Sequence, residues 1–243
     1  MPGGTHWSKA KGVSIGVVAV FTLAGTVMAQ PYYLRGPFNG WAGTGTELLD
    51  QGGGKYSATV GGLTVGSGFE VKATTDDWSF AGPSNEIDPP GTVGNNFLQE
   101  VGASGSMTIN FFPQTSWADG WSPSATLRVG FEDPHAHGWD IMGSFDGWAN
   151  PQAVMTDLGN GLYKAIVSAA PGSYEFKFRK ENDWGYAIGR TFENNGANAY
   201  GTVNPGDNAL ELYLDLPNGR WQANSIPTPG ALALVGIGGL LAG

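Results

Sequence analysis

The chain has 243 residues, with 12 basic and 21 acidic side chains, a formal charge of −9 and no cysteine. An acidic chain without lysine or arginine clusters repels a phosphate backbone, so we expect no nucleic-acid partner. The lack of cysteine excludes a disulfide scaffold, thiolate zinc sites and cysteine nucleophiles.

The first 29 residues have the features of a secretory signal peptide. Lys9 and Lys11 give a positive start, residues 13–23 are apolar or small apart from one threonine, and residues 27–29 offer a small-residue cleavage site before Gln30. The apolar run is shorter than the roughly 20 residues that span a bilayer. We therefore expect a secreted bacterial protein that is extracellular or on the cell surface. Cleavage would remove two basic residues and no acid, which moves the formal charge from −9 to about −11.

The 40 glycines and 15 prolines separate short apolar runs, a profile that predicts an all-β fold. The predicted strands, in chain order, are residues 33–38, 55–60, 69–73, 97–101, 106–112, 140–145, 162–167, 173–180 and 209–214. In residues 173–180 an apolar set alternates with a charged set. This period of two predicts that Tyr174, Phe176 and Phe178 face the core and that Lys177 faces outward.

The central phrase of the sequence occurs twice. Residues 35–41 (RGPFNGW) return as residues 142–148 (MGSFDGW), an offset of 107, and Trp221 follows Trp117 at an offset of 104 as a closing match. A period of this size suits a whole domain rather than a solenoid unit. We therefore predict two tandem antiparallel immunoglobulin-like β-sandwiches, residues 31–121 and 139–224. Residues 122–138 are either a linker or the first strand of the second domain.

The repeated pattern is Gly-x-Phe-x-x-Trp, followed about thirty residues later by an aromatic-x-aromatic-Lys strand in the second half and then by a tryptophan. It resembles the glycogen- and starch-binding carbohydrate-binding modules, an early-set, immunoglobulin-like group that includes the module of the AMP-kinase β-subunit. The resemblance covers residues 140–216 well and residues 33–112 less well.

In that family, two tryptophan faces and a lysine line a shallow sugar platform, with an asparagine near the last loop. The resemblance implies sites made of Trp148, Lys177, Trp184 and Asn204 in the second half and of Trp41, Lys72, Trp78 and Asn96 in the first half. Tryptophan can stack on the apolar face of a pyranose while polar neighbours meet its hydroxyls. The alternative is that these tryptophans close the core; Trp117, Trp121, Trp139 and Trp221 are expected to fill the core or its edge.

Metal ligands and a catalytic centre are not expected. His135 and His137 could hold a metal beside Glu132 and Asp133, but a solvated turn is the preferred reading. Calcium ligands among Asp76, Asp77, Glu86 and Asp88 fit no recognised loop.

No motif for nucleophilic, metalloprotease or phosphate chemistry is present. A carboxylate pair such as Glu181 and Asp183 could serve a glycosidase, yet neither half has an insertion that would build a cleft. We therefore expect no enzyme and no cofactor.

Residues 226–243 place Pro227-Thr228-Pro229 before an uncharged apolar stretch. This tail resembles the bacterial PEP-CTERM sorting signal, although Thr228 stands where that family usually has glutamate and no basic cluster follows. The resemblance implies transient membrane contact and processing by a protease of the exosortase type. The alternative is a short hydrophobic tail that packs or aggregates. The expected function is noncatalytic binding of a glucan or exopolysaccharide, and the rival is a structural or adhesive matrix protein whose modules bind no sugar.

Overall fold

The structure is a computed structural model that describes residues 31–42, 45–76, 81–82, 96–135, 137–193 and 196–227. Over these residues the chain is all-β with antiparallel strands, which confirms the predicted fold class. The one short helical element among them is the 3₁₀ turn η1 (Pro37–Asn39). No helix in the described part of the chain is long and apolar enough to cross a membrane.

The first half contains a bent sheet with the strand order β5-β4-β1-β2-β3-β7-β8, and β6 also pairs with β4. Its strands are β1 (Tyr32–Arg35), β2 (Glu47–Asp50), β3 (Tyr56–Gly61), β4 (Gly68–Thr74), β5 (Ala81–Gly82), β6 (Phe97–Glu100), β7 (Ser106–Phe112) and β8 (Arg128–Glu132). The sheet turns a corner at β2, because Leu48 pairs with β1 whereas Leu49 pairs with β3.

The second half has two sheets, ordered β10-β9-β13-β14 with β15 on β13, and β11-β12-β16-β17. Its strands are β9 (Trp139–Gly143), β10 (Ala153–Val154), β11 (Thr156–Asp157), β12 (Leu162–Ser168), β13 (Gly172–Lys180), β14 (Asp183–Ile188), β15 (Ala199–Val203), β16 (Ala209–Asp215) and β17 (Arg220–Ile226). The sheets face each other across a core in which the rings of Phe176 and Trp221 meet edge to face at 5.6 Å.

Strand pairing shows the same connectivity in both halves. The pairs β1–β4, β4–β6, β3–β7 and β7–β8 correspond to β9–β13, β13–β15, β12–β16 and β16–β17. β8 lies within residues 122–138, the segment predicted as a linker or a first strand. It pairs with β7 as β17 pairs with β16, so it is the last strand of the first half.

The closing tryptophan match of the sequence is wrong. Leu214 pairs with Trp221, and Phe111, the counterpart of Leu214, pairs with Val129. Trp117 lies instead in the long β7–β8 connection, where its indole nitrogen donates to Thr126 O at 2.9 Å. The reason is that the β7–β8 connection is much longer than the β16–β17 turn, so spacing from one tryptophan to the next does not track the register.

The inward set of β13 is confirmed. Phe176 and Phe178 are fully buried, and Tyr174 packs against the same core. Trp139 and Trp221 are also buried, as expected of core side chains, while Trp117 and Trp121 are half-buried. Burial of these large side chains is the main source of stability for two halves of this size.

Two predicted strands end earlier than the sequence suggested, because Phe38 and Phe145 lie in turns after β1 and β9. At each strand end a glycine allows the neighbouring strand to approach. A Cβ on Gly36 would lie within 2.4 Å of Glu70 O, and one on Gly143 within 2.6 Å of Glu175 O.

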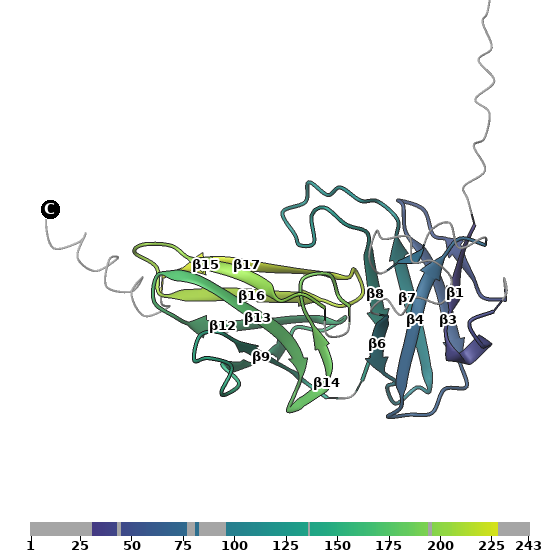
Figure 1. Cartoon of the computed structure of the whole chain (residues 1–243), viewed down its shortest axis with the longest axis horizontal. Helices are drawn as coiled ribbons and strands as arrows, with labels where there is room; N and C mark the ends of the chain where they lie inside the picture. Colours follow the sequence, from purple (N-terminus) through teal and green to yellow (C-terminus); the bar gives the residue numbers. More distant parts are fainter. Residues whose placement is uncertain are drawn as a thin grey trace, which may run out of the picture.

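The two halves lie against each other along a seam (Figure 1), and their buried side chains form one continuous core. In Figure 1 the strands of the first half run steeply, β15, β16 and β17 of the second half run nearly horizontally, and the β7–β8 connection extends toward the second half. Ser122 and Trp221 exchange backbone hydrogen bonds of 2.8 and 2.7 Å, and Phe131 N donates to Leu216 O at 2.9 Å. Asp119 accepts hydrogen bonds from both Arg128 and Arg220. The β7–β8 connection is therefore hydrogen-bonded to β17 through Ser122 and Asp119.

Candidate functional site

Each half holds a tryptophan in a rare backbone conformation after its first strand. Trp148 has a φ of 70° and Trp41 a φ of 58°. Their backbone N–H groups donate to Gly143 O and Gly36 O, both at 2.9 Å. Left-handed backbone is uncommon for a bulky side chain, and such strain clusters at functional sites. The strain therefore identifies these two turns as candidates.

Trp184 lies beside Trp148 on the outer face of the second half. Its ring centroid is 6.2 Å from that of Trp148, and the two ring planes meet at 44°. Trp184 is 44% exposed and Trp148 is half-buried, so neither ring belongs to the core. The register of β13 and β14 shifts between Arg179 and Lys180, and this irregularity lets Trp184 leave the regular ladder.

Lys177 lies on the same outer face of β13 but is held within the protein. Its ammonium donates to Gly196 O at 2.8 Å. Partial burial lowers the pKa of Lys177, because the charged form loses hydration. Lys177 is two residues from Arg179, whose guanidinium carbon lies 5.0 Å from the Trp184 ring centroid.

Asn204 does not join this group. Ala199 pairs with Phe176 and Val203 with Gly172, so Asn204 lies at the opposite end of the β13–β15 pair. At about 3.3 Å per residue, it is roughly 20 Å from Lys177 along the strands. The residue near Lys177 is instead Asn198, whose amide nitrogen donates to Glu175 at 3.0 Å.

The first half places its predicted residues differently. Lys72 is only 5% exposed and pairs directly with Arg35 across β1 and β4, while Trp41 is half-buried. Trp78 lies outside the described residues. Asn96 donates to Glu70, as Asn198 does to Glu175, so the register makes Asn96 the counterpart of Asn198 rather than of Asn204. The sequence alone offered no signal for Asn198, because the repeated Glu–Asn pairing becomes visible only when the strand register is known.

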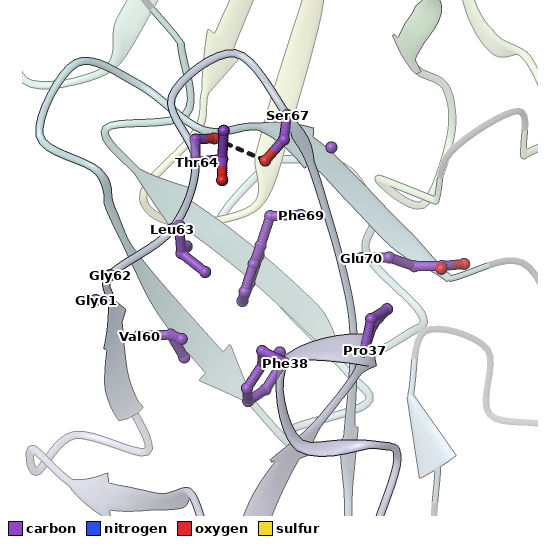
Figure 2. Close-up of a pocket in the computed structure, with 11 residues that line it drawn as sticks. Pro37, Phe38, Val60, Gly61, Gly62, Leu63, Thr64, Ser67, Phe69 and Glu70 are labelled. Carbon is purple, nitrogen blue, oxygen red and sulfur yellow. Dashed lines mark hydrogen bonds between the residues drawn. The ribbon is translucent and has the colours of Figure 1, made fainter.

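A separate cavity of about 460 Å³ opens at one end of the first half, between η1 and the β3–β4 connection. Figure 2 shows Phe38, Val60, Leu63 and Phe69 directed into this space, whereas Glu70 points away from them. Phe38 and Phe69 stack with centroids 5.3 Å apart. The cavity contains none of the predicted site residues; the hydroxyl residues Thr64 and Ser67 line one side of it, and Ser67 Oγ already donates to Thr64 O at 2.7 Å.

Among the described residues, the other candidates of the sequence are not assembled into sites, and the calcium candidates Asp77, Glu86 and Asp88 lie outside those residues. The predicted solvated turn at His135 is wrong, because His135 is 7% exposed and its ring lies 4.9 Å from the ring of Trp139. Packing at the seam covers this ring and removes it from water. Among the described residues no cluster of three metal-ligating side chains occurs. Hydrogen bonds from Gly185 N and Lys180 lower the pKa of Asp183, opposite to the raised value that a general acid needs.

Comparison of the sequence with protein-family models gives no match, and comparison with curated proteins gives none. The function of the chain must therefore be argued from this geometry. The outer face of the second half offers two accessible indole rings inclined to each other, next to carboxylate, amide and guanidinium groups. This arrangement can bind an apolar ring face that carries hydroxyls.

Proposed function

We propose that the chain is a noncatalytic carbohydrate-binding protein whose second half binds a neutral glucan or exopolysaccharide through Trp148 and Trp184. The single observation that carries this proposal is the accessible tryptophan pair, with rings 6.2 Å apart and inclined at 44°. A core role would bury both rings, yet Trp184 is 44% exposed.

The angle between the rings favours a particular shape of polysaccharide. Stacking needs each sugar face to lie parallel to one indole ring. Two rings inclined at 44° suit successive sugar units whose faces change direction, as in a helically twisted glucan, better than a flat ribbon-like chain.

Charge favours a neutral ligand. Glu175 and Asp146 are exposed on and beside this face, and the cations near the rings are engaged: Arg179 by Asp140 and Lys177 by Gly196 O. An anionic polysaccharide would meet uncompensated carboxylates here, whereas sugar hydroxyls can donate to them.

In this proposal the protein acts outside a bacterial cell. The N-terminal signal pattern would direct export, and the C-terminal tail, through transient membrane contact and an exosortase-type protease, would direct sorting to the surface. Residues 1–30 and 228–243 lie outside the described residues, so both steps rest on the sequence alone.

The test is retention on insoluble starch granules, with cellulose as the flat-chain comparison. The double variant W148A/W184A should lose retention with little change in thermal midpoint, because the two rings lie outside the core and alanine bears a similar backbone strain at position 148. The control is W121A, which removes another half-buried tryptophan whose ring lies 6.3 Å from that of Tyr213. Equal retention of the double variant and the wild type would refute the site.

A second candidate function is a structural matrix role, which the seam between the halves favours. The shared core and the hydrogen bonds from Arg128 and Arg220 to Asp119 join the halves into one extended unit rather than two hinged binding modules. If the wild-type chain is retained on neither polysaccharide, the sugar-binding proposal fails and the structural matrix role remains.

A further inference from the structure

We infer that Asp140 and Arg179 are positioning residues for Trp184: this buried ion pair fixes the β13–β14 turn and orients the exposed ring. The inference rests on the proposed function for its purpose, but its geometry can be tested without any ligand.

The pair joins neighbouring strands beneath the turn. Arg179 Nε donates to Asp140 Oδ1 at 2.9 Å, and Arg179 Nη2 donates to Oδ2 at 2.6 Å. Asp140 is fully buried and Arg179 is 6% exposed. Two parallel hydrogen bonds between a guanidinium and a carboxylate fix the relative orientation of both groups.

The same carboxylate also holds the turn itself. Asn182 N donates to Asp140 Oδ2 at 3.1 Å, and Asn182 has a φ of 62°, in the left-handed region. Trp184 follows two residues later, with its ring centroid 5.0 Å from the Arg179 guanidinium carbon. Asp140 thus fixes the backbone before the ring, and Arg179 contacts the ring directly.

Stability alone does not account for this arrangement. Removing two charges from water costs several kcal/mol per ion, and apolar residues of similar volume commonly give equal or greater stability than a buried ion pair. What the pair supplies and an apolar pair lacks is a defined geometry. A defined geometry matters where the exposed Trp184 ring must keep its angle to Trp148.

The first half secures its equivalent turn with different residues. By register, Tyr33 and Thr74 occupy the positions of Asp140 and Arg179. There, Arg35 reaches from β1, and its guanidinium donates to Thr74 Oγ1 at 2.7 Å and to Asp76 O at 2.8 Å. Each half therefore buries a guanidinium at this end of its sheet, from β1 in the first half and from β13 in the second.

The chain offers a matched control. Asp119 and Arg128 form another two-pronged pair, with bonds of 2.7 and 3.1 Å, and the Arg128 guanidinium carbon lies 4.2 Å from the Trp117 ring centroid. Asp119 is more exposed than Asp140 and also binds Arg220, but the two-pronged hydrogen bonding is the same and the ring that Arg128 contacts is not in the proposed site.

The experiment uses the full chain labelled with 5-fluorotryptophan and observed by fluorine NMR, with the Trp184 signal assigned from W184F. The variants are D140N and R179K, with D119N as the control. D140N and R179K should shift or broaden the Trp184 signal and weaken retention on starch granules by up to about tenfold, the loss expected when one stacked ring is misplaced. D119N should move the Trp117 signal and leave the Trp184 signal and retention unchanged.

An unchanged Trp184 signal in folded D140N or R179K would overturn the inference, whatever happens to retention. R179K keeps the buried charge paired, so it decides the matter if D140N does not fold. If the wild type is not retained on starch, the proposed function fails, and the fluorine signals still decide whether the pair positions Trp184.

Discussion

Replacement of His135 by phenylalanine should make the stability of this protein much less sensitive to acid. His135 lies at the seam, where its ring contacts that of Trp139 at a tilt of 39° and faces Glu100 of β6 and Lys180 of β13 as well as the neighbouring His137. Desolvation lowers the pKa of His135 from 6.5 to about 4, and the charge of Glu100 opposes this only in part. Phenylalanine keeps the aromatic contact and does not titrate.

Proton binding sets the direction in which the free energy of unfolding changes with pH. The folded state keeps His135 neutral down to about pH 4, whereas the unfolded state protonates it below pH 6.5, so the unfolded state binds more protons between these values. The contribution is complete above pH 6.5 and is lost as the pH falls toward 4. Between pH 7 and pH 4.5 the loss is about 2 kcal/mol for this pKa difference.

The assay is urea unfolding of the wild type and of H135F at pH 7 and pH 4.5. The fall in free energy of unfolding should be about 2 kcal/mol smaller in H135F, because carboxylates that do not interact with His135 titrate alike in both proteins and cancel in the difference. H137F, at an exposed neighbour, should behave like the wild type. An equal fall in the wild type and H135F would refute the buried neutral state of His135.

Two further predictions concern the seam and the tail. G130A should destabilise the protein by about 1–3 kcal/mol in urea unfolding, because the new Cβ would lie 2.1 Å from Pro217 O. The control G45A should be nearly neutral, because its Cβ would meet nothing within 4 Å. Equal effects of the two variants would contradict the tight seam. If residues 227–243 are a processed sorting signal, mass spectrometry of protein from the cell surface should show a chain that ends near Pro229, and an intact C-terminus on exported protein would refute processing.

Much of the fold could be predicted from the sequence because its signals are local. Alternation in residues 173–180 assigned Phe176 and Phe178 to the core and Lys177 to the other face, since side chains of a strand alternate by covalent geometry. The repeated phrase likewise predicted that both halves share a plan, and the strand pairing follows one connectivity.

The site was predicted less completely, for reasons that lie in the pairing of distant segments. The rings of Trp148 and Trp184 lie together. Asn204 lies beyond the end of β15 that is distant from Lys177, and Asn198 lies near Lys177 instead. Strand register, not sequence spacing, decides which residue lies opposite Lys177. His135 looked like part of an exposed turn and is buried, because the seam that covers it is built by strands from both halves.

The sequence by itself determined the strand content, the inward faces and the duplication, since each depends on chain geometry over a few residues or on direct repetition. Only the tertiary structure decided that Asp140 is a buried partner of Arg179 and that this pair lies beneath Trp184. Those contacts join residues about 40 positions apart, and their energy depends on burial, which no local pattern records.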